Sequence, residues 1–242
     1  MKKDLGIVKF LLLFAVLSLS GCQTEEPIQL PEVVAPNAYF YYEIDRDTLL
    51  QALDAGEEEP WTLLEEKPDL DAKYSPVEVR WSGSNYLKIS EAMYRTVWQE
   101  APDSRQLLDW RYEVACKHVG VGFDLAVTMF SLDKSAKEST TRSIVIQPQY
   151  NLIEVAEWTF VLGEGQTFLD NPQVDIEANF VSPEEALQGA EEVAGEEFRQ
   201  EVNDACQVTV QYALEATSWR VIYEGGPEVL VDAITGEPVL QE

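Results

Sequence analysis

The chain has 242 residues, with 44 aspartates and glutamates against 17 lysines and arginines, and its formal net charge is −27. A charge of this size repels nucleic-acid phosphates and anionic lipid headgroups, so it excludes nucleic-acid binding. Hydrophobic residues make up 45% of the chain and aromatic residues 10%, which indicates a packed core and not a disordered acidic chain.

The first 22 residues have the features of an export signal. Lys2 and Lys3 give a positively charged start, and the apolar stretch from Leu5 to Leu19 has the length of a signal-peptide core but is too short to cross a bilayer comfortably. It ends in Leu19-Ser20-Gly21-Cys22, which resembles the lipobox of bacterial lipoproteins. The resemblance implies a signal peptide over residues 1–21, cleaved before Cys22, whose thiol carries a diacylglyceryl group. The alternative is an ordinary secretory signal with an incidental cysteine.

The lipid implied at Cys22 would anchor the mature chain to a membrane from outside the cytoplasm. One acyl chain binds reversibly, whereas two or three on one residue make release negligible. Gln23 follows Cys22; in bacteria with two membranes, a residue other than aspartate here permits transfer to the outer membrane. We expect a cell-envelope location, on the outer face of the cytoplasmic membrane or on the outer membrane. Removing residues 1–21 takes away three lysines and one aspartate, which leaves 14 basic and 43 acidic residues and a charge of −29.

Residues 22–37 are rich in proline and glutamate and predict an extended tether. Residues 38–175 then predict an N-terminal α+β region. Its first strand is expected over 39–44, a short helix over 48–55 and an acidic loop over 55–71. Beyond these, the patterns predict a helix over 90–101 and strands over 77–81, 108–116, 121–132, 143–147 and 152–161.

The last sixty residues carry the clearest signals. Ser182-Pro183-Glu184-Glu185 is a capping box with proline at the first helical position. Apolar residues then recur at spacings of three or four from Leu187 to Val202, which predicts a helix. Alternating patterns predict strands over 206–214, 219–223 and 229–234.

These elements resemble the PepSY family over Val181 to Val239. The resemblance rests on the helix start at Ser182, the strand Trp219 to Tyr223 and the segment Val231-Asp232-Ala233-Ile234-Thr235-Gly236. It implies that residues 176–242 form a PepSY-like domain, in which one helix packs on a small antiparallel sheet, as in cystatin-like folds. PepSY-like domains are associated with modulating secreted peptidases, so the resemblance implies a non-enzymatic binding role.

The segment after Val231 also has a direct physical interpretation. The side chains of Asp232 and Thr235 can bond to nearby backbone groups, and Gly236 can adopt a positive φ. We therefore predict a structural turn and not a catalytic motif at these residues.

The expected fold class is α+β, with a helix on an antiparallel sheet at the C-terminus preceded by a β-rich region. That region repeats the order of helix and strands predicted for the C-terminal part. In this alignment Asn151, which also tolerates a positive φ, replaces Gly236. Duplication and chance similarity both remain open.

The sequence predicts no catalytic residue, metal ligand or cofactor. His118 is the only histidine, and the zinc-protease, nucleophile-elbow, phosphate-loop and dinucleotide motifs are absent. A catalytic pair of Cys116 and His118 is disfavoured because no third orienting residue is evident. Once Cys22 is lipidated, Cys116 and Cys206 remain, and both a disulfide and two buried thiols are open.

Two features leave other functions open. Acidic pairs and runs such as Asp45/Asp47, Glu57-Glu58-Glu59 and Asp69/Asp71 could bind calcium, although no EF-hand pattern orders them. Aromatic residues from Tyr39 to Tyr42 could form a glycan platform, although such spacing is more typical of a core. We expect a surface-anchored module that binds a protein or peptide, and the alternatives are an envelope assembly factor, with or without calcium, and a carboxylate-based hydrolase.

Overall fold

The structure is a computed structural model, and it describes residues 32–33, 38–57, 60–76, 78–102, 107–134, 138–161, 180–213 and 217–239. The predicted signal peptide and Cys22 lie outside the described residues. So do Glu58 and Glu59 of the acidic run Glu57-Glu58-Glu59, and residues 162–175 of the predicted N-terminal region.

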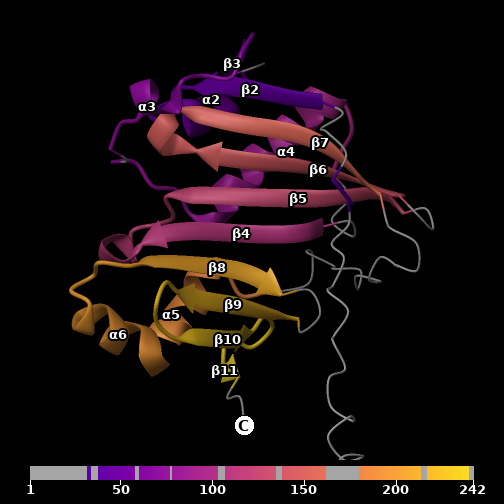
Figure 1. The fold of residues 1–242 in the computed structure, drawn as a ribbon. Helices are drawn as coiled ribbons and strands as arrows, with labels where there is room; N and C mark the ends of the chain where they lie inside the picture. The colour runs from indigo at the N-terminus through magenta and orange to yellow at the C-terminus, as the bar shows by residue number, and fades with distance from the viewer. Residues whose placement is uncertain are drawn as a thin grey trace, which may run out of the picture. The chain divides into compact units, whose positions relative to one another are not determined.

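Eleven strands of the described chain form one sheet, in which every strand pair is antiparallel (Figure 1). The order across the sheet is β11-β10-β9-β8-β4-β5-β6-β7-β2-β3, and β1 also pairs with β7. The strands are β1 (Glu32–Val33), β2 (Ala38–Ile44), β3 (Trp61–Leu64), β4 (Leu107–Ala115), β5 (Leu125–Lys134), β6 (Glu138–Gln147), β7 (Leu152–Val161), β8 (Gln207–Ala213), β9 (Ser218–Tyr223), β10 (Glu228–Asp232) and β11 (Pro238–Val239).

The long helices lie together behind the sheet in the view of Figure 1. Helix α4 packs on β5 and β6, and α5 packs on β8, β9 and β10. No helix among the described residues is long and apolar enough to cross a membrane. The helical segments are α2 (Leu49–Ala55), α3 (Leu70–Lys73), α4 (Gly83–Trp98), η2 (Cys116–His118), η3 (Pro148–Tyr150), α5 (Pro183–Ala190), η4 (Glu191–Gly195) and α6 (Glu196–Glu201).

The core lies between the sheet and these helices, because successive strand residues point to opposite faces. In β4, Trp110, Tyr112 and Val114 are buried on the helix side, and the alternate residues Arg111 and Glu113 are partly exposed on the other side. The same alternation in β8 buries Val208, Val210 and Tyr212. The α+β class predicted from the sequence is therefore confirmed, with one large antiparallel sheet.

The order of the strands is symmetric about the pair β4–β8. On each side a helix precedes an antiparallel meander: α4 precedes β4 to β7, and α5–η4–α6 precedes β8 to β11. The two leading strands pair with each other, with Arg111 opposite Gln211. Before the last strand of each meander stands a residue with positive φ, Asn151 at 50° and Gly236 at 75°.

Several predicted elements differ in position or extent. The strand expected over 143–147 is longer, because β6 begins at Glu138. The strand expected over 77–81 is absent from its described residues 78–81, where Trp81 makes only an isolated bridge with Phe123. Helix α4 begins at Gly83 and not at residue 90, because Ser82 caps it by accepting the N–H of Asn85. The strand expected from residue 121 begins at Leu125, after a loop.

Three strands lie where none was expected, and one of them is the short β11 (Pro238–Val239), which pairs with β10. β3 falls within the acidic segment interpreted as loop, and it pairs with β2 at one edge of the sheet. β1 falls within the predicted tether 22–37. It pairs with β7 at Val161 and Phe160. The opposite end of β7, at Leu152, lies at the same end of the sheet as the connection between β4 and β5, as the registers across β6 and β5 show.

Candidate functional site

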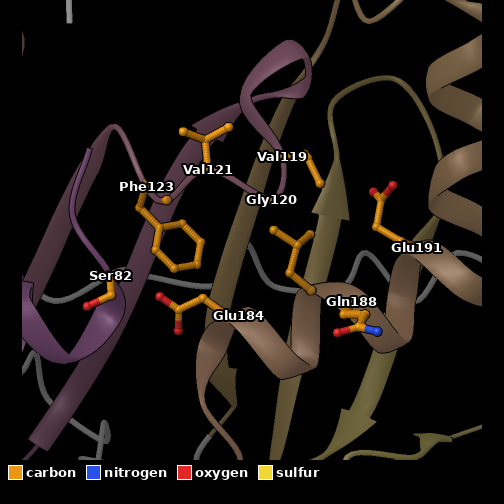
Figure 2. Close-up of a pocket in the computed structure, with 10 residues that line it drawn as sticks. Ser82, Val119, Gly120, Val121, Phe123, Glu184, Gln188 and Glu191 are labelled. Atoms are coloured by element: carbon orange, nitrogen blue, oxygen red, sulfur yellow. The ribbon is translucent and has the colours of Figure 1, made fainter. Parts of the chain in front are cut away.

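A pocket of about 440 Å³ opens between the β4–β5 loop and helix α5. Figure 2 shows Val119 and Val121 on the loop, facing Glu184 and Gln188 on the helix, with the ring of Phe123 beside them. The volume is within the range of small-molecule sites. The pocket is lined by Ser82, Val119, Gly120, Val121, Gly122, Phe123, Glu184, Leu187, Gln188 and Glu191.

Three polar side chains hold the base of the β4–β5 loop. Asp124 accepts a hydrogen bond from Nε of Arg80 at 2.7 Å and another from the N–H of Ala115 at 2.8 Å. His118, on the other side of the loop, lies 2.7 Å from the guanidinium of Arg80 and 3.4 Å from Asp124. The side chain of Arg80 is only 8% exposed, so these charges are shielded from water. The cluster therefore fixes both ends of the loop that forms one wall.

A disulfide joins Cys116, directly before this cluster, to Cys206, directly before β8. The two Cα atoms are 5.2 Å apart, and the N–H of Cys116 donates to the carbonyl of Cys206 at 2.9 Å. In this bonded state Cys116 is no nucleophile for His118. A carboxylate that could orient His118, that of Asp124, does lie beside it at 3.4 Å. The shorter hydrogen bonds of Asp124, however, come from Arg80 and Ala115 and hold the loop.

The loop follows a path that needs glycine. Gly120 has φ of 84° and Gly122 has φ of 128°, both in the region that disfavours other residues. A Cβ at Gly122 would also lie 3.0 Å from the carbonyl oxygen of Trp81. The chain therefore passes close to Trp81, and the next residue, Phe123, lines the pocket.

Helix α5 forms the opposite wall, and its N-terminus meets that of α4. Glu184 accepts the N–H of Gly83 at 2.7 Å, and a Cβ at Gly83 would collide with the ring of Pro183. The predicted capping box is present, since Ser182 and Glu185 bond reciprocally. Those bonds lower the pKa of Glu185, mainly through the N–H of Ser182. The start of the wall is thus fixed by two sets of caps.

The far end of this wall lies at a π-helical turn, η4, of a kind often found at functional sites. Glu191, its first residue, accepts a bond from the hydroxyl of Tyr223 at 2.6 Å and pairs with Arg199 at 2.7 Å. Burial and the bond to Glu191 raise the pKa of Tyr223, and the bond to Glu191 is the largest cause that raises the pKa of Arg199. Gly195 leaves the space that the hydroxyl of Tyr223 occupies.

The other residues singled out from the sequence have structural positions. Asp232 accepts the N–H groups of Ile234 and Thr235, both at 2.8 Å, and Gly236 has the expected positive φ. Asp45 and Asp69 accept backbone N–H groups at the starts of turns or helices. Among the described residues, no group of three histidine, cysteine or carboxylate side chains is arranged to hold a metal ion.

Two surface features lie away from the pocket. Tyr39, Tyr41 and Trp158 gather on the sheet, with ring centres 4.9 and 6.0 Å from that of Tyr39, whereas Tyr42 points into the core. At one edge of the sheet, Leu63 of β3 is 56% exposed.

No pattern in the sequence indicates the pocket. The sequence patterns place Val121 and Gly122 at the start of a predicted strand and Glu184 in a helix cap. The walls come from residues more than sixty positions apart, so no local pattern joins them.

Comparison of the chain with known protein families, characterised proteins and solved structures finds no match to any of the three.

Proposed function

We propose that the protein is a lipoprotein anchored outside the cytoplasm through Cys22, and that it acts as a non-enzymatic binding module. The pocket between the β4–β5 loop and α5 is its binding site, and the ligand is a peptide or a segment of another envelope protein. A secreted peptidase is the partner that the PepSY resemblance suggests.

The observation that carries this proposal is the fixed geometry of the pocket walls. A disulfide and the Arg80–Asp124–His118 cluster hold the loop, and caps and ion pairs hold α5. A site that is rigid before binding loses little conformational entropy when a ligand enters it, which favours recognition.

The symmetric arrangement about β4–β8 supports a PepSY-like origin for both halves. We propose that each half is one copy of a helix-and-meander module and that the N-terminal copy has diverged. Asn151 and Gly236 then occupy equivalent turns, and β2 and β3 are additions to the first copy.

The hydrolase alternative gains one observation, since Glu184 and Glu191 line the same pocket. They stand seven residues apart on the helical wall, about 10 Å along its axis. Glu191 is held by Arg199 at 2.7 Å and by the hydroxyl of Tyr223 at 2.6 Å, so its carboxylate already has two partners from the protein itself. The binding function therefore fits the contacts of these carboxylates better.

The anchor is tested by metabolic labelling with an alkynyl fatty acid. We expect the wild-type chain to incorporate the label and Cys22→Ser to lose it and accumulate uncleaved. Cys116→Ser/Cys206→Ser is the control, because it removes two other sulfur atoms and should keep the label. Label that persists in Cys22→Ser would contradict the anchor.

The binding function is tested by a photo-crosslinking residue at Val121, which is 66% exposed at the pocket rim. Val193, which is 52% exposed and does not line the pocket, is the matched control. We expect Val121 to form a discrete adduct with an envelope protein in intact cells and Val193 to form none. The same adducts from both positions, or none from Val121, would refute the function.

A further inference from the structure

We propose that the pocket takes a basic side chain, lysine or arginine, of the partner protein. The inference deepens the binding function proposed above and rests on it. The stem of the side chain would lie along the apolar wall, and its cationic head would meet the carboxylates of Glu184 on α5 and Glu191 at the start of η4.

The charge of the lining favours a cation. Among the described residues that line it, the ionisable side chains are Glu184 and Glu191, and none is a lysine or an arginine. Arg199, behind the wall, pairs with Glu191 at 2.7 Å and offsets its charge, so Glu184, which accepts the N–H of Gly83, supplies most of the negative charge of the lining. An anionic ligand would be repelled, and an apolar one would remove water from carboxylates without replacing its bonds.

The apolar part of the lining favours a long stem over a compact ion. Val119, Val121 and Phe123 form one side, and Leu187 lies opposite. Lysine and arginine side chains bury their methylene groups against such surfaces while the charged head keeps polar partners. A small hydrated cation would leave this surface unused, consistent with the absence of a three-ligand metal cluster among the described residues.

The carboxylates are in position before the ligand arrives. One oxygen of Glu184 is held by the N–H of Gly83, and Glu191 is fixed at the π-helical turn by Tyr223 and Arg199. Gln188, between them on the helix, adds a neutral donor and acceptor. Acid, amide and acid thus follow one another along one wall and offer a cationic head more than one polar partner.

The test uses the processed lipoprotein in nonionic detergent at 0.15 M salt, which suppresses long-range attraction to the acidic body. The probes are capped peptides of four glycines around a central lysine, arginine, norleucine or glutamate. Calorimetry should detect the lysine and arginine peptides and give at least about tenfold weaker binding for norleucine, because a charge-assisted bond is lost. The glutamate peptide should not bind.

Glu184→Gln is the decisive variant, because glutamine can still accept the N–H of Gly83 while the charge is removed. It should weaken the binding of the lysine peptide about tenfold or more. Glu197→Gln, which removes an equal charge from exposed α6, should leave binding within about twofold.

Norleucine binding equal to lysine, or equal loss in both variants, would overturn the basic-side-chain assignment. So would an absence of any peptide binding. The crosslink at Val121 then distinguishes the two proposals. An adduct together with one of these results would reject only the basic side chain as ligand, whereas the absence of an adduct would reject the binding function as well.

Discussion

Gly122 and Gly120 differ in what surrounds them, although both have positive φ. A Cβ at Gly122 would meet the Trp81 carbonyl and Cβ of Arg80, whereas nothing lies within 4 Å of a Cβ at Gly120. We expect Gly122→Ala to lower the free energy of unfolding by about 2–3 kcal/mol and to weaken ligand binding, and Gly120→Ala to cost about 1 kcal/mol. Urea denaturation of both variants measures the difference. Equal losses would show that the close approach to Trp81 is not a constraint.

Asp232 gives the C-terminal turn a pH dependence. Bonds from the N–H groups of Thr235 and Ile234 lower the pKa of Asp232 in the folded state. A lowered folded pKa stabilises the fold above the unfolded value, and this stabilisation is lost as pH falls from about 4 through the folded pKa. We expect the unfolding free energy of the wild type to fall more steeply below pH 4 than that of Asp232→Asn.

Glu224→Gln is the control for this comparison, because Glu224 is exposed in the neighbouring β9–β10 turn. Its curve should run parallel to the wild type. If Asp232→Asn also runs parallel, the turn does not depend on the charge of Asp232. If Asp232→Asn instead abolishes peptide binding, the segment is a functional site and not the structural turn described above.

At the scale of elements, the helical spacing places Phe198 on the correct face of its helix but does not show how deeply its side chain is buried. Its spacing on the apolar helix face suggests a place in one small core with Trp219 and Val221. In the structure Phe198 is only partly buried and packs on Tyr223, 6.1 Å between ring centres, and on Gly226. Trp219 and Val221 are fully buried.

We therefore expect Phe198→Ala to cost about 2 kcal/mol, below the 3–5 kcal/mol typical of a fully buried phenylalanine. Trp219→Ala, at a fully buried site, should cost more. Chemical denaturation of the processed chain provides both values. Equal costs would mean that Phe198 belongs to the central core.

Elements with strong local signals could be predicted, and elements defined by distant partners could not. The capping box at Ser182 and the alternation in β4, β8 and β9 are encoded within a few residues, and the structure has those elements nearly where expected. β3 forms because β2 offers a free edge, and α4 starts early because Ser82 caps it. The pocket needs the loop and α5 together, so the sequence indicated its pieces but not its existence.

At the scale of the whole molecule, the disulfide spans the pair of strands that joins the two meanders. Cys116 and Cys206 are 90 residues apart in the sequence, and closing a loop of that length stabilises a fold by about 4.5 kcal/mol on the chain-entropy model. We expect the intact mass to be lower by two hydrogens than that of the reduced chain. Cys116→Ala/Cys206→Ala should lower the unfolding free energy by about 2–5 kcal/mol. Two thiols that alkylate after denaturation without reductant would contradict the bond.

The pairing of β1 with the end of β7 limits how far the sheet could stand from a lipid on Cys22. The chain from Cys22 to Glu32 has ten residue steps and can reach at most about 35 Å, so a lipid on Cys22 would keep that end of the sheet within this distance of the membrane. The β4–β5 loop lies at the other end of the strands, roughly 30 Å further along a ten-residue strand such as β7. A pocket at that end of the strands would therefore lie no more than about 65 Å from the membrane, so a lipid on Cys22 would limit its partners to molecules within this distance of the same membrane.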